Sequence, residues 1–342
     1  MTDHTNGDAV SQIGIVGTGG LGGILGEQFN RLPSAEVSAI ADIDPAALSK
    51  TATRLAVPET SLYEDYERML DDESLDAVLI VTPNGLHYEQ TVAALDRGLH
   101  VLCEKPLTID LADAKALVER DEASDSVLMV GYQRHLNPGF IEARERWALG
   151  DSTPTFVTAE ITQDWRHHFE KGTNWRMNTS LSGGGHLYTT GTHIIDAILW
   201  VTGLTPKYVT ARMDYHGDDE RLDTQSSIVI EFENGTIANV FDSGIVPRTR
   251  EHIHIWDDQG AMYFDGREWE DRTMKKITGD GSEVSPYADS GERKTKPEAF
   301  IESIRENETP PATARDALRA TIVKEAAYES AATNERVEVP SP

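Results

Sequence analysis

The sequence predicts an α/β Rossmann-type domain with a parallel, doubly wound sheet, followed by an α+β domain with a large open, mostly antiparallel sheet. Short apolar runs alternate with helical segments up to about residue 131, and a glycine-rich turn directly follows the first run. After residue 138 longer strand-like runs are joined by turns. We therefore expect a disordered tail at 1–11, a first domain at 12–131 and a second domain at 132–342.

The first apolar run, 13–16, leads into Gly17-Thr18-Gly19-Gly20-Leu21-Gly22 and then into a helical pattern. A strand, a glycine turn and a helix in this order are typical of a dinucleotide-binding segment. Gly17 allows the tight turn, Gly19 lets the backbone approach a pyrophosphate, and Gly22 lets helix and strand pack closely. Gly20 and Leu21 belong to the same predicted phosphate-binding turn.

A second run, 37–41, ends in Asp42, at the spacing expected for the acid that accepts hydrogen bonds from an adenosine ribose. A carboxylate at this position repels the 2′-phosphate of NADP, and Ile43, Asp44 and Pro45 bring no positive charge. The sequence therefore favours NAD over NADP. Asp44 before Pro45 also indicates the start of a helix, with the aspartate as its N-cap.

Further strands are expected at 77–81, at 99–103 and at 127–130, with helices between them. Right-handed crossovers bring the carboxyl ends of such strands to one edge of the sheet, which is where ligands bind. Lys105 follows the strand after Gly98, and it is either an ordinary surface lysine or a ligand-facing charge whose pKa responds to desolvation. The residues expected to line this edge are Thr82, Pro83, Asn84, His87, Glu104, Lys105 and Pro106.

In the second region, Glu233-Asn234-Gly235 indicates a hairpin between two strands. A glycine-rich segment, 182–191, leads into an apolar helix on which Thr189, His193 and Asp196 share one face. A large sheet without helices on one side leaves an apolar face, so we expect a homo-oligomer, a dimer or a tetramer. Two helices at 297–307 and 312–332 are interpreted as structural.

Acidic residues dominate the composition: Asp and Glu number 58 against 31 Lys and Arg, a formal net charge of -27. Such a surface repels nucleic acid and anionic membranes, and its self-repulsion is relieved by salt, which suggests a halophile with a high-salt cytoplasm. The amino-terminal residues lack the pattern of a signal peptide, so a cytoplasmic location is expected. The single cysteine, Cys103, lies in an apolar run and is interpreted as a buried hydrophobe.

These motifs together resemble the Gfo/Idh/MocA oxidoreductases, the family of glucose-fructose oxidoreductase and inositol dehydrogenase. The resemblance runs over about 13–339 and rests on five groups of residues: the glycine turn, Thr82-Pro83-Asn84 with His87, Glu104-Lys105-Pro106, Gly131-Tyr132 with Arg134 and Pro138, and the glycine segment before Gly191, His193 and Asp196. It implies a Rossmann domain, an open-sheet domain and a nicotinamide cofactor.

The resemblance also implies roles for two residues. Oxidation of an alcohol requires a base for the hydroxyl proton while a hydride leaves the carbon. His193 is expected to be that base, and Lys105 is expected to orient the hydroxyl and stabilise the alkoxide, although the two could exchange roles. Many relatives carry aspartate four residues before the histidine, where this chain has Thr189. A hydroxyl brings no charge, so the imidazolium should be less stabilised here.

For the substrate we expect a sugar, a polyol or a related hydroxy compound, because aromatic and hydrogen-bonding side chains gather near residue 170. The expected substrate-binding residues are Lys105, Tyr132, Arg134, Trp175, Arg176 and His193. Three other functions remain open: redox-neutral, NAD-dependent glycoside cleavage or epimerisation, a ligand-sensing protein without catalysis, and a metal enzyme. The metal enzyme is the weakest of these, because His252 and His254 alternate on one strand face without an evident carboxylate partner.

Overall fold

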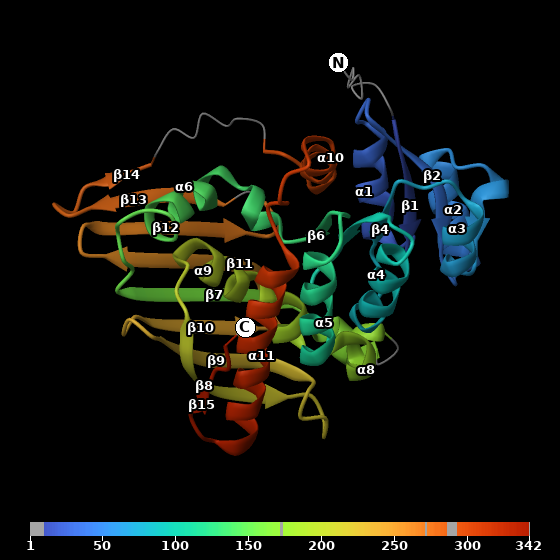
Figure 1. The fold of residues 1–342 in the computed structure, drawn as a ribbon. Helices are drawn as coiled ribbons and strands as arrows, with labels where there is room; N and C mark the ends of the chain where they lie inside the picture. Colours follow the sequence, from blue (N-terminus) through green and yellow to red (C-terminus); the bar gives the residue numbers. More distant parts are fainter. Residues whose placement is uncertain (1–9, 172–173, 271, 286–292, 342) are drawn as a thin grey trace, which may run out of the picture. The chain divides into compact units, whose positions relative to one another are not determined.

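The computed structural model describes residues 10–171, 174–270, 272–285 and 293–341 (Figure 1). They divide into two compact units. The first unit takes the chain up to Thr108, Ala116–Gln133 and Lys294–Ala314, and the second takes Ile109–Lys115, Arg134–Arg293 and the chain from Arg315. This division differs from a single boundary after residue 131, because the segment 294–314 returns to the first unit. Residues 1–9 of the expected tail lie outside the described residues, and β1 already begins at Ser11.

The first unit is built on a parallel sheet with the strand order β3-β2-β1-β4-β5-β6. Its strands are β1 (Ser11–Val16), β2 (Ala35–Ala41), β3 (Leu62–Tyr63), β4 (Ala77–Ile80), β5 (His100–Cys103) and β6 (Leu128–Val130). Its helical elements are α1 (Gly20–Asn30), α2 (Pro45–Leu55), η1 (Glu59–Ser61), α3 (Tyr66–Asp72), η2 (Asn84–Leu86), α4 (His87–Leu95) and α10 (Lys296–Glu306). Helix α5 (Leu111–Glu122) and η3 (Gln133–Leu136) cross the division between the units. The predicted parallel sheet is confirmed, and only the two-residue edge strand β3 was not expected.

Local sequence signals explain how these elements begin and what they bury. Ile13, Ile15 and Leu79 are fully buried, as expected for the apolar strands of a sheet that is covered on both faces. Helix α2 begins as predicted: Asp44 Oδ1 accepts a hydrogen bond from the Ala46 amide at 2.9 Å, with Pro45 in the first turn.

Helix α10 belongs to the first unit although it follows the second unit in sequence. The Thr295 hydroxyl accepts a hydrogen bond from the Glu298 amide, and the Glu298 carboxylate accepts one from the Thr295 amide. This reciprocal capping fixes where the helix begins. Phe300 then packs edge-on against Phe29 of α1, with 6.3 Å between ring centroids. The burial of Phe300 holds the helix in place.

The second unit is built on a nine-stranded sheet with the order β14-β13-β12-β11-β7-β10-β9-β8-β15, in which β7 and β10 are parallel and the other pairs antiparallel. Its strands are β7 (Phe156–Asp164), β8 (Pro206–Tyr215), β9 (Asp223–Phe232), β10 (Ile237–Ser243), β11 (Ile245–Asp257), β12 (Gly260–Arg267), β13 (Thr273–Thr278), β14 (Glu283–Val284) and β15 (Val337–Glu338). Its helical elements are α6 (Pro138–Trp147), α7 (Arg166–Lys171), η4 (Trp175–Met177), α8 (Thr179–Ser182), η5 (Leu187–Gly191), α9 (Thr192–Thr202) and α11 (Ala314–Thr333).

Helices cover one face of this sheet. Figure 1 shows α6, α9 and α11 against the strands, and Phe140, Ile198 and Val323 from these helices share a core with the sheet residues. Successive side chains of β10 point to opposite faces of the sheet. Ile237 and Phe241 lie on the face away from the helices, where they are 41% and 48% exposed. The mostly antiparallel sheet with one open face is therefore confirmed, and the hairpin at Gly235 (φ +88°) joins β9 to β10 as predicted.

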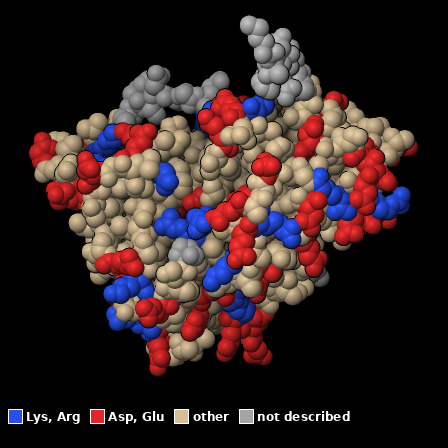
Figure 2. Space-filling model, in the orientation of Figure 1, with Lys and Arg blue, Asp and Glu red and all other residues tan. Residues whose placement is uncertain are grey.

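Acidic side chains are spread over the face of the molecule shown in Figure 2, in keeping with the net charge of -27. Among the described residues, no helix is both long enough and apolar enough to cross a membrane.

Candidate active site

The glycine turn connects β1 to α1 at the carboxyl edge of the first sheet. Gly17 has φ +96°, and a Cβ there would lie 2.7 Å from the Val81 carbonyl oxygen, while a Cβ at Gly22 would lie 2.2 Å from the Gly17 carbonyl oxygen. Side chains at Gly19 and Gly20 would instead project into open space. No side chain caps α1, so its first amides can bind an anion. The turn therefore fits the pyrophosphate of a dinucleotide.

Asp42, at the end of β2, is held beside this turn. Its Oδ2 accepts hydrogen bonds from the Thr18 amide at 2.6 Å and from the Thr18 hydroxyl at 2.9 Å, and its Oδ1 accepts one from the Asp44 amide at 2.9 Å. The remaining acceptor capacity of the carboxylate can serve a ribose hydroxyl. Ile43, the next residue, is 87% exposed, and Leu21 on α1 is 42% exposed.

His87 connects the loops that follow β4 and β5. Its Nδ1 lies 2.8 Å from the Pro106 carbonyl oxygen, and its Nε2 lies 2.9 Å from the Thr82 carbonyl oxygen. Burial lowers the pKa of His87 below the ordinary value, although both carbonyl groups favour the charged form. The Thr82 hydroxyl donates to Gln90 Oε1 at 2.6 Å, and Asn84, which begins η2 after Pro83, is 3% exposed. The Thr82-Pro83-Asn84 loop is thus fixed from several sides.

Glu104 and Lys105 follow β5, as predicted. Glu104 is buried, its Oε2 accepts a hydrogen bond from the Lys105 amide at 3.3 Å, and its Oε1 pairs with the ammonium of Lys296 from α10. Burial alone would raise the pKa of Glu104, but the charges of Lys296 and Lys105 outweigh it and hold the pKa below its usual value. A Cβ at Gly131 would lie 2.7 Å from Glu104 Oε1, so a glycine is needed there.

The next residues along the chain were expected to bind substrate. Tyr132, in the first unit, is 1% exposed. Arg134 lies in the second unit, where its Nε donates to Glu251 Oε1 at 2.8 Å. Arg272 Nη2 also contacts Glu251, at 2.6 Å, so one buried carboxylate holds two guanidinium groups. Burial opposes the charge of Glu251, but the two arginines lower its pKa. Arg134 Nη1 has no hydrogen-bond partner among the described residues, which leaves its two N–H groups for a ligand.

His193 lies near the start of α9 and is 4% exposed. Thr189 precedes it in η5, a π-helical turn, so the α-helical register that would place both residues on one face begins only at Thr192. Asp196 follows His193 by three residues in α9, and its Oδ2 lies 2.9 Å from His135 Nε2. Burial raises the pKa of Asp196. Its partner His135 stacks on Trp200, with 4.1 Å between ring centroids.

The glycines before His193 allow close packing against β9. A Cβ at Gly185 would lie 1.9 Å from the Asp223 carbonyl oxygen. The Asp223 carboxylate accepts hydrogen bonds from the amides of Gly185 and Leu187 at 2.9 and 2.8 Å. Burial and the neighbouring Asp242 raise the pKa of Asp223 to about 6. This carboxylate fixes the start of the segment that carries His193.

Trp175 and Arg176 lie in η4, which Asn174 caps. The Arg176 guanidinium lies 4.4 Å from the Trp175 ring centroid and 5.9 Å from that of Trp165, which are cation–π distances. Burial lowers the pKa of Arg176. The guanidinium of Arg176 is therefore held against two indole rings of the same segment.

Two residues near these groups were missed by sequence reasoning. Trp269, in the turn between β12 and β13, is 48% exposed, and its ring centroid lies 6.1 Å from that of His193. An aromatic residue in a hairpin turn was the only available signal. Lys296 gave no signal, because it lies far from Glu104 in the sequence.

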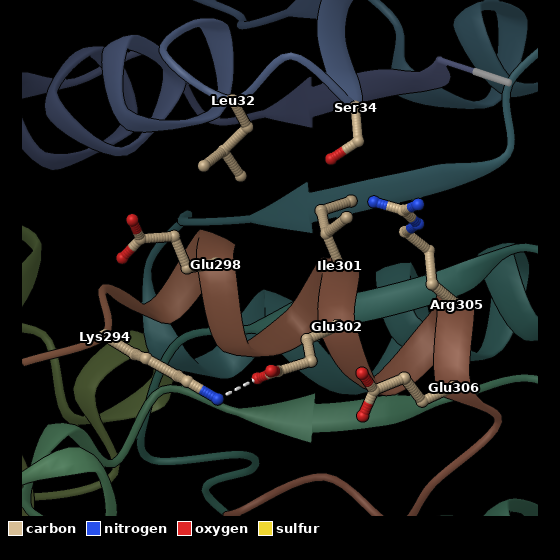
Figure 3. Close-up of a pocket in the computed structure, with 8 residues that line it drawn as sticks. All are labelled: Leu32, Ser34, Lys294, Glu298, Ile301, Glu302, Arg305 and Glu306. Carbon is tan, nitrogen blue, oxygen red and sulfur yellow. Dashed lines mark hydrogen bonds and ion pairs between the residues drawn. The ribbon is translucent and has the colours of Figure 1, made fainter. Parts of the chain in front are cut away.

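Two pockets of the described residues lie away from these loops. A cavity of about 590 Å³ lies between α10 and the segment that precedes β2, at the sheet edge opposite the glycine turn (Figure 3). A second, of about 450 Å³, lies on the open face of the second sheet, lined by Arg212, Gln225 and Phe241 among others.

His254, considered above as a metal ligand, pairs with Asp265 at 3.0 Å, so a carboxylate partner that the sequence did not reveal is present. Within the described residues, no group of three or more His, Cys, Asp or Glu side chains is arranged to hold a metal ion.

Comparison with known proteins places the chain among nicotinamide enzymes. Residues 11–132 match the family model described as "Oxidoreductase family, NAD-binding Rossmann fold", and residues 143–263 match the "GFO/IDH/MocA C-terminal domain". D-xylose 1-dehydrogenase (NADP(+)) 2 of Haloferax volcanii is 30% identical over 95% of this chain and 99% of its own. Myo-inositol 2-dehydrogenase of Thermotoga maritima is 25% identical over 93% of this chain and 96% of its own.

Solved structures share the fold. Aldose-aldose oxidoreductase from Caulobacter crescentus superposes with a TM-score of 0.84, 24% identity and coverage of 96% of this chain and 100% of that chain. Levoglucosan dehydrogenase in complex with NADH and L-sorbose superposes with a TM-score of 0.82, 22% identity and coverage of 98% and 100%.

Proposed function

This chain belongs to the Gfo/Idh/MocA oxidoreductase family, and from that premise we propose that it oxidises a hydroxyl group of a sugar or polyol. The observation that carries the proposal is the carboxyl edge of the first sheet. There the uncapped start of α1, the carboxylate of Asp42 and the Glu104-Lys105 pair follow parallel strands of one sheet. This edge is where doubly wound folds bind a dinucleotide. Relatives with matching length act on xylose and inositol by their names.

The proposed roles follow from the chemistry of each side chain. A bound nicotinamide supplies the hydride acceptor. His193 takes the hydroxyl proton, and Lys105 donates a hydrogen bond that orients the hydroxyl and stabilises the developing alkoxide. Thr189 keeps the third proposed catalytic role, in which its hydroxyl would bring no charge to the imidazole.

The proposed cofactor contacts come from the glycine turn, from Asp42 and from the loops after β4 and β5. The residues are Gly17, Gly19, Gly20, Leu21, Gly22, Asp42, Thr82, Pro83, Asn84, His87, Glu104 and Lys105. We propose NAD as the preferred form, because Asp42 is fixed beside the turn and would repel a 2′-phosphate. NADP appears in the names of two relatives, so the choice needs a direct measurement.

The proposed substrate contacts come from Lys105, Tyr132, Arg134, Trp175, Arg176 and His193, together with Trp269. Trp269 is half exposed beside His193, and its ring could cover the C–H face of a sugar. The free Nη1 donor of Arg134 would suit a hydroxyl.

We also propose a homo-oligomer, a dimer or a tetramer, in which the open face of the second sheet is covered. Phe156, Ile237, Phe241 and Ile245 support it, because all four are more than a third exposed. A cytoplasmic location stays a prediction.

The test is an assay of purified protein at high salt with NAD or NADP and a panel of aldoses, polyols and glycosides, in which nicotinamide absorbance and products are followed together. We expect reduced cofactor to accumulate with one substrate class, faster with NAD. Lys105→Met and His193→Asn should each lower kcat by at least about 100-fold, the usual contribution of a proton-transfer group. Product without reduced cofactor would replace the proposal by a redox-neutral reaction, and cofactor binding without turnover across the panel would favour a sensor.

A further inference from the structure

Glu104 is a buried carboxylate directly beside Lys105. Its side chain is 7% exposed, and the Gly131 backbone closes one side of it. The Glu104 amide donates to the Ile80 carbonyl oxygen at 2.9 Å, so the residue is fixed between two strand ends. An ionised carboxylate in such a place needs a positive partner, because desolvation opposes its charge.

That partner is Lys296, from a segment far along the chain. Its side chain is only 12% exposed, and its ammonium pairs with Glu104 Oε1. Lys296 begins α10, although the positive end of the helix dipole disfavours a cation at this position. The capping of α10 by Thr295 and the packing of Phe300 on Phe29 nevertheless direct Lys296 to Glu104. A poorly placed, nearly buried cation is thus held against one carboxylate.

Two lysines act on this carboxylate. Lys296 and Lys105 both act on Glu104 electrostatically, and the other titratable groups nearby are His87 of α4 and the thiol of Cys103. Burial lowers the pKa of His87 and raises the pKa of Cys103, so both stay neutral near pH 7. Among the described residues of the first unit, Glu104 and Lys296 are thus two charged groups whose pairing bears on the electrostatic surroundings of Lys105.

We propose that Lys296 is a positioning residue for Lys105: by neutralising Glu104, it prevents the carboxylate from drawing the Lys105 ammonium away from substrate. The inference rests on the role of Lys105 in the proposed function. Without Lys296, Lys105 would have to balance the charge of Glu104 and would be held more strongly in the charged form. One ion pair, between Lys296 and Glu104, thereby connects the start of α10 to the Glu-Lys-Pro motif.

The test measures the pKa of Lys105 in the full-length protein without substrate, by competitive acetylation with labelled acetic anhydride and mass spectrometry of the peptide that contains Lys105. Lys296→Met should raise this pKa by about one unit, the usual effect of an unbalanced neighbouring charge. Glu104→Gln should lower it, because Lys296 then repels Lys105. The double variant Glu104→Gln/Lys296→Met should return it close to the wild-type value.

Lys294→Met is the matched control. Lys294 lies two residues before Lys296, and its ammonium pairs with Glu302 on α10, at the cavity in Figure 3. This substitution removes the same charge and an exposed ion pair without touching Glu104, so it should leave the pKa of Lys105 unchanged.

An unchanged Lys105 pKa in folded Lys296→Met would overturn the inference, as would an equal change in Lys294→Met. If Lys296→Met does not fold, the decisive comparison is between Glu104→Gln and the double variant. Equal pKa values of Lys105 in these two proteins would also overturn the inference. The assay needs no turnover, so it separates the inference from the proposed function. If the Lys105 pKa shifts in Lys296→Met but the wild type oxidises no sugar, only the proposed function is refuted. If the wild type oxidises a sugar but the Lys105 pKa does not shift, only the inference is refuted.

Discussion

His87 lies between the Thr82 and Pro106 carbonyl oxygens, with one ring nitrogen within hydrogen-bond distance of each. A neutral imidazole has one N–H and can donate to only one of them, whereas the imidazolium could donate to both. Burial nevertheless lowers the pKa of His87, so desolvation is the stronger effect. The folded protein therefore favours neutral His87, while the unfolded chain accepts a proton near the ordinary value of 6.5.

This residue gives a pH-dependent stability. A histidine whose pKa is lowered by folding contributes stability above pH 6.5, and that stability is lost as the pH falls towards the folded-state pKa. The free energy of unfolding should fall between pH 7 and pH 5 more steeply in the wild type than in His87→Gln, by about 1.4 kcal/mol for each unit of lowering. Urea unfolding at several pH values measures this difference. If the free energy of unfolding changed with pH equally in the wild type and in His87→Gln, the pKa of His87 would not differ between the folded and unfolded states.

At the scale of elements, helix α10 carries a part of the fold that local patterns do not reveal. The sequence indicates where this helix begins and ends, but its docking depends on Phe29 and Phe300, which meet only in the folded chain. The strands of the first sheet were predictable because each is a short apolar run next to a turn signal. Strands β3, β14 and β15 have two residues each, too few to show an alternation.

The same contrast applies to the candidate site. Gly17, Asp42 and Lys105 lie in motifs where residue type and spacing carry the chemistry, and the structure places all three after parallel strands. His193 and Asp196 both lie in α9, three residues apart, whereas Thr189 lies in the π-helical turn before it, so the helical spacing predicted from Thr189 to His193 does not hold. Lys296 could not be predicted, because its partner is chosen by tertiary packing.

Helix α10 should therefore stabilise the first unit through Phe300. Phe300→Ala removes a fully buried ring and should lower the free energy of unfolding by about 3–5 kcal/mol. Leu149→Ala is the control, because Leu149 is 69% exposed and its loss should cost less than about 0.5 kcal/mol. Denaturant unfolding of the two variants provides the measurement. A similar small loss in both would mean that α10 contributes little to the unit.

At the scale of the whole molecule, charge is the dominant feature. The net charge of -27 and the acidic side chains visible across the face in Figure 2 produce self-repulsion in the folded state. A high-salt setting for this chain stays a proposal that rests on its net charge.

Salt should raise the Tm, with most of the increase below about 1 M, where the Debye length falls from about 10 Å to about 3 Å. Comparing the Tm in chloride and in sulfate salts at equal ionic strength separates two effects of salt, the screening of surface charges and the exclusion of sulfate from the protein surface. Equal increases in both salts are expected. A Tm that does not respond to chloride would refute high-salt adaptation.

In the proposed reaction a hydride passes from substrate carbon to nicotinamide on this protein. To test this, the active compound from the panel is prepared with deuterium at the reacting carbon, and cofactor and product are analysed by mass spectrometry. We expect one deuterium in the reduced nicotinamide and oxidised product in equal amount. Product formed without deuterium in released cofactor would contradict the proposed reaction.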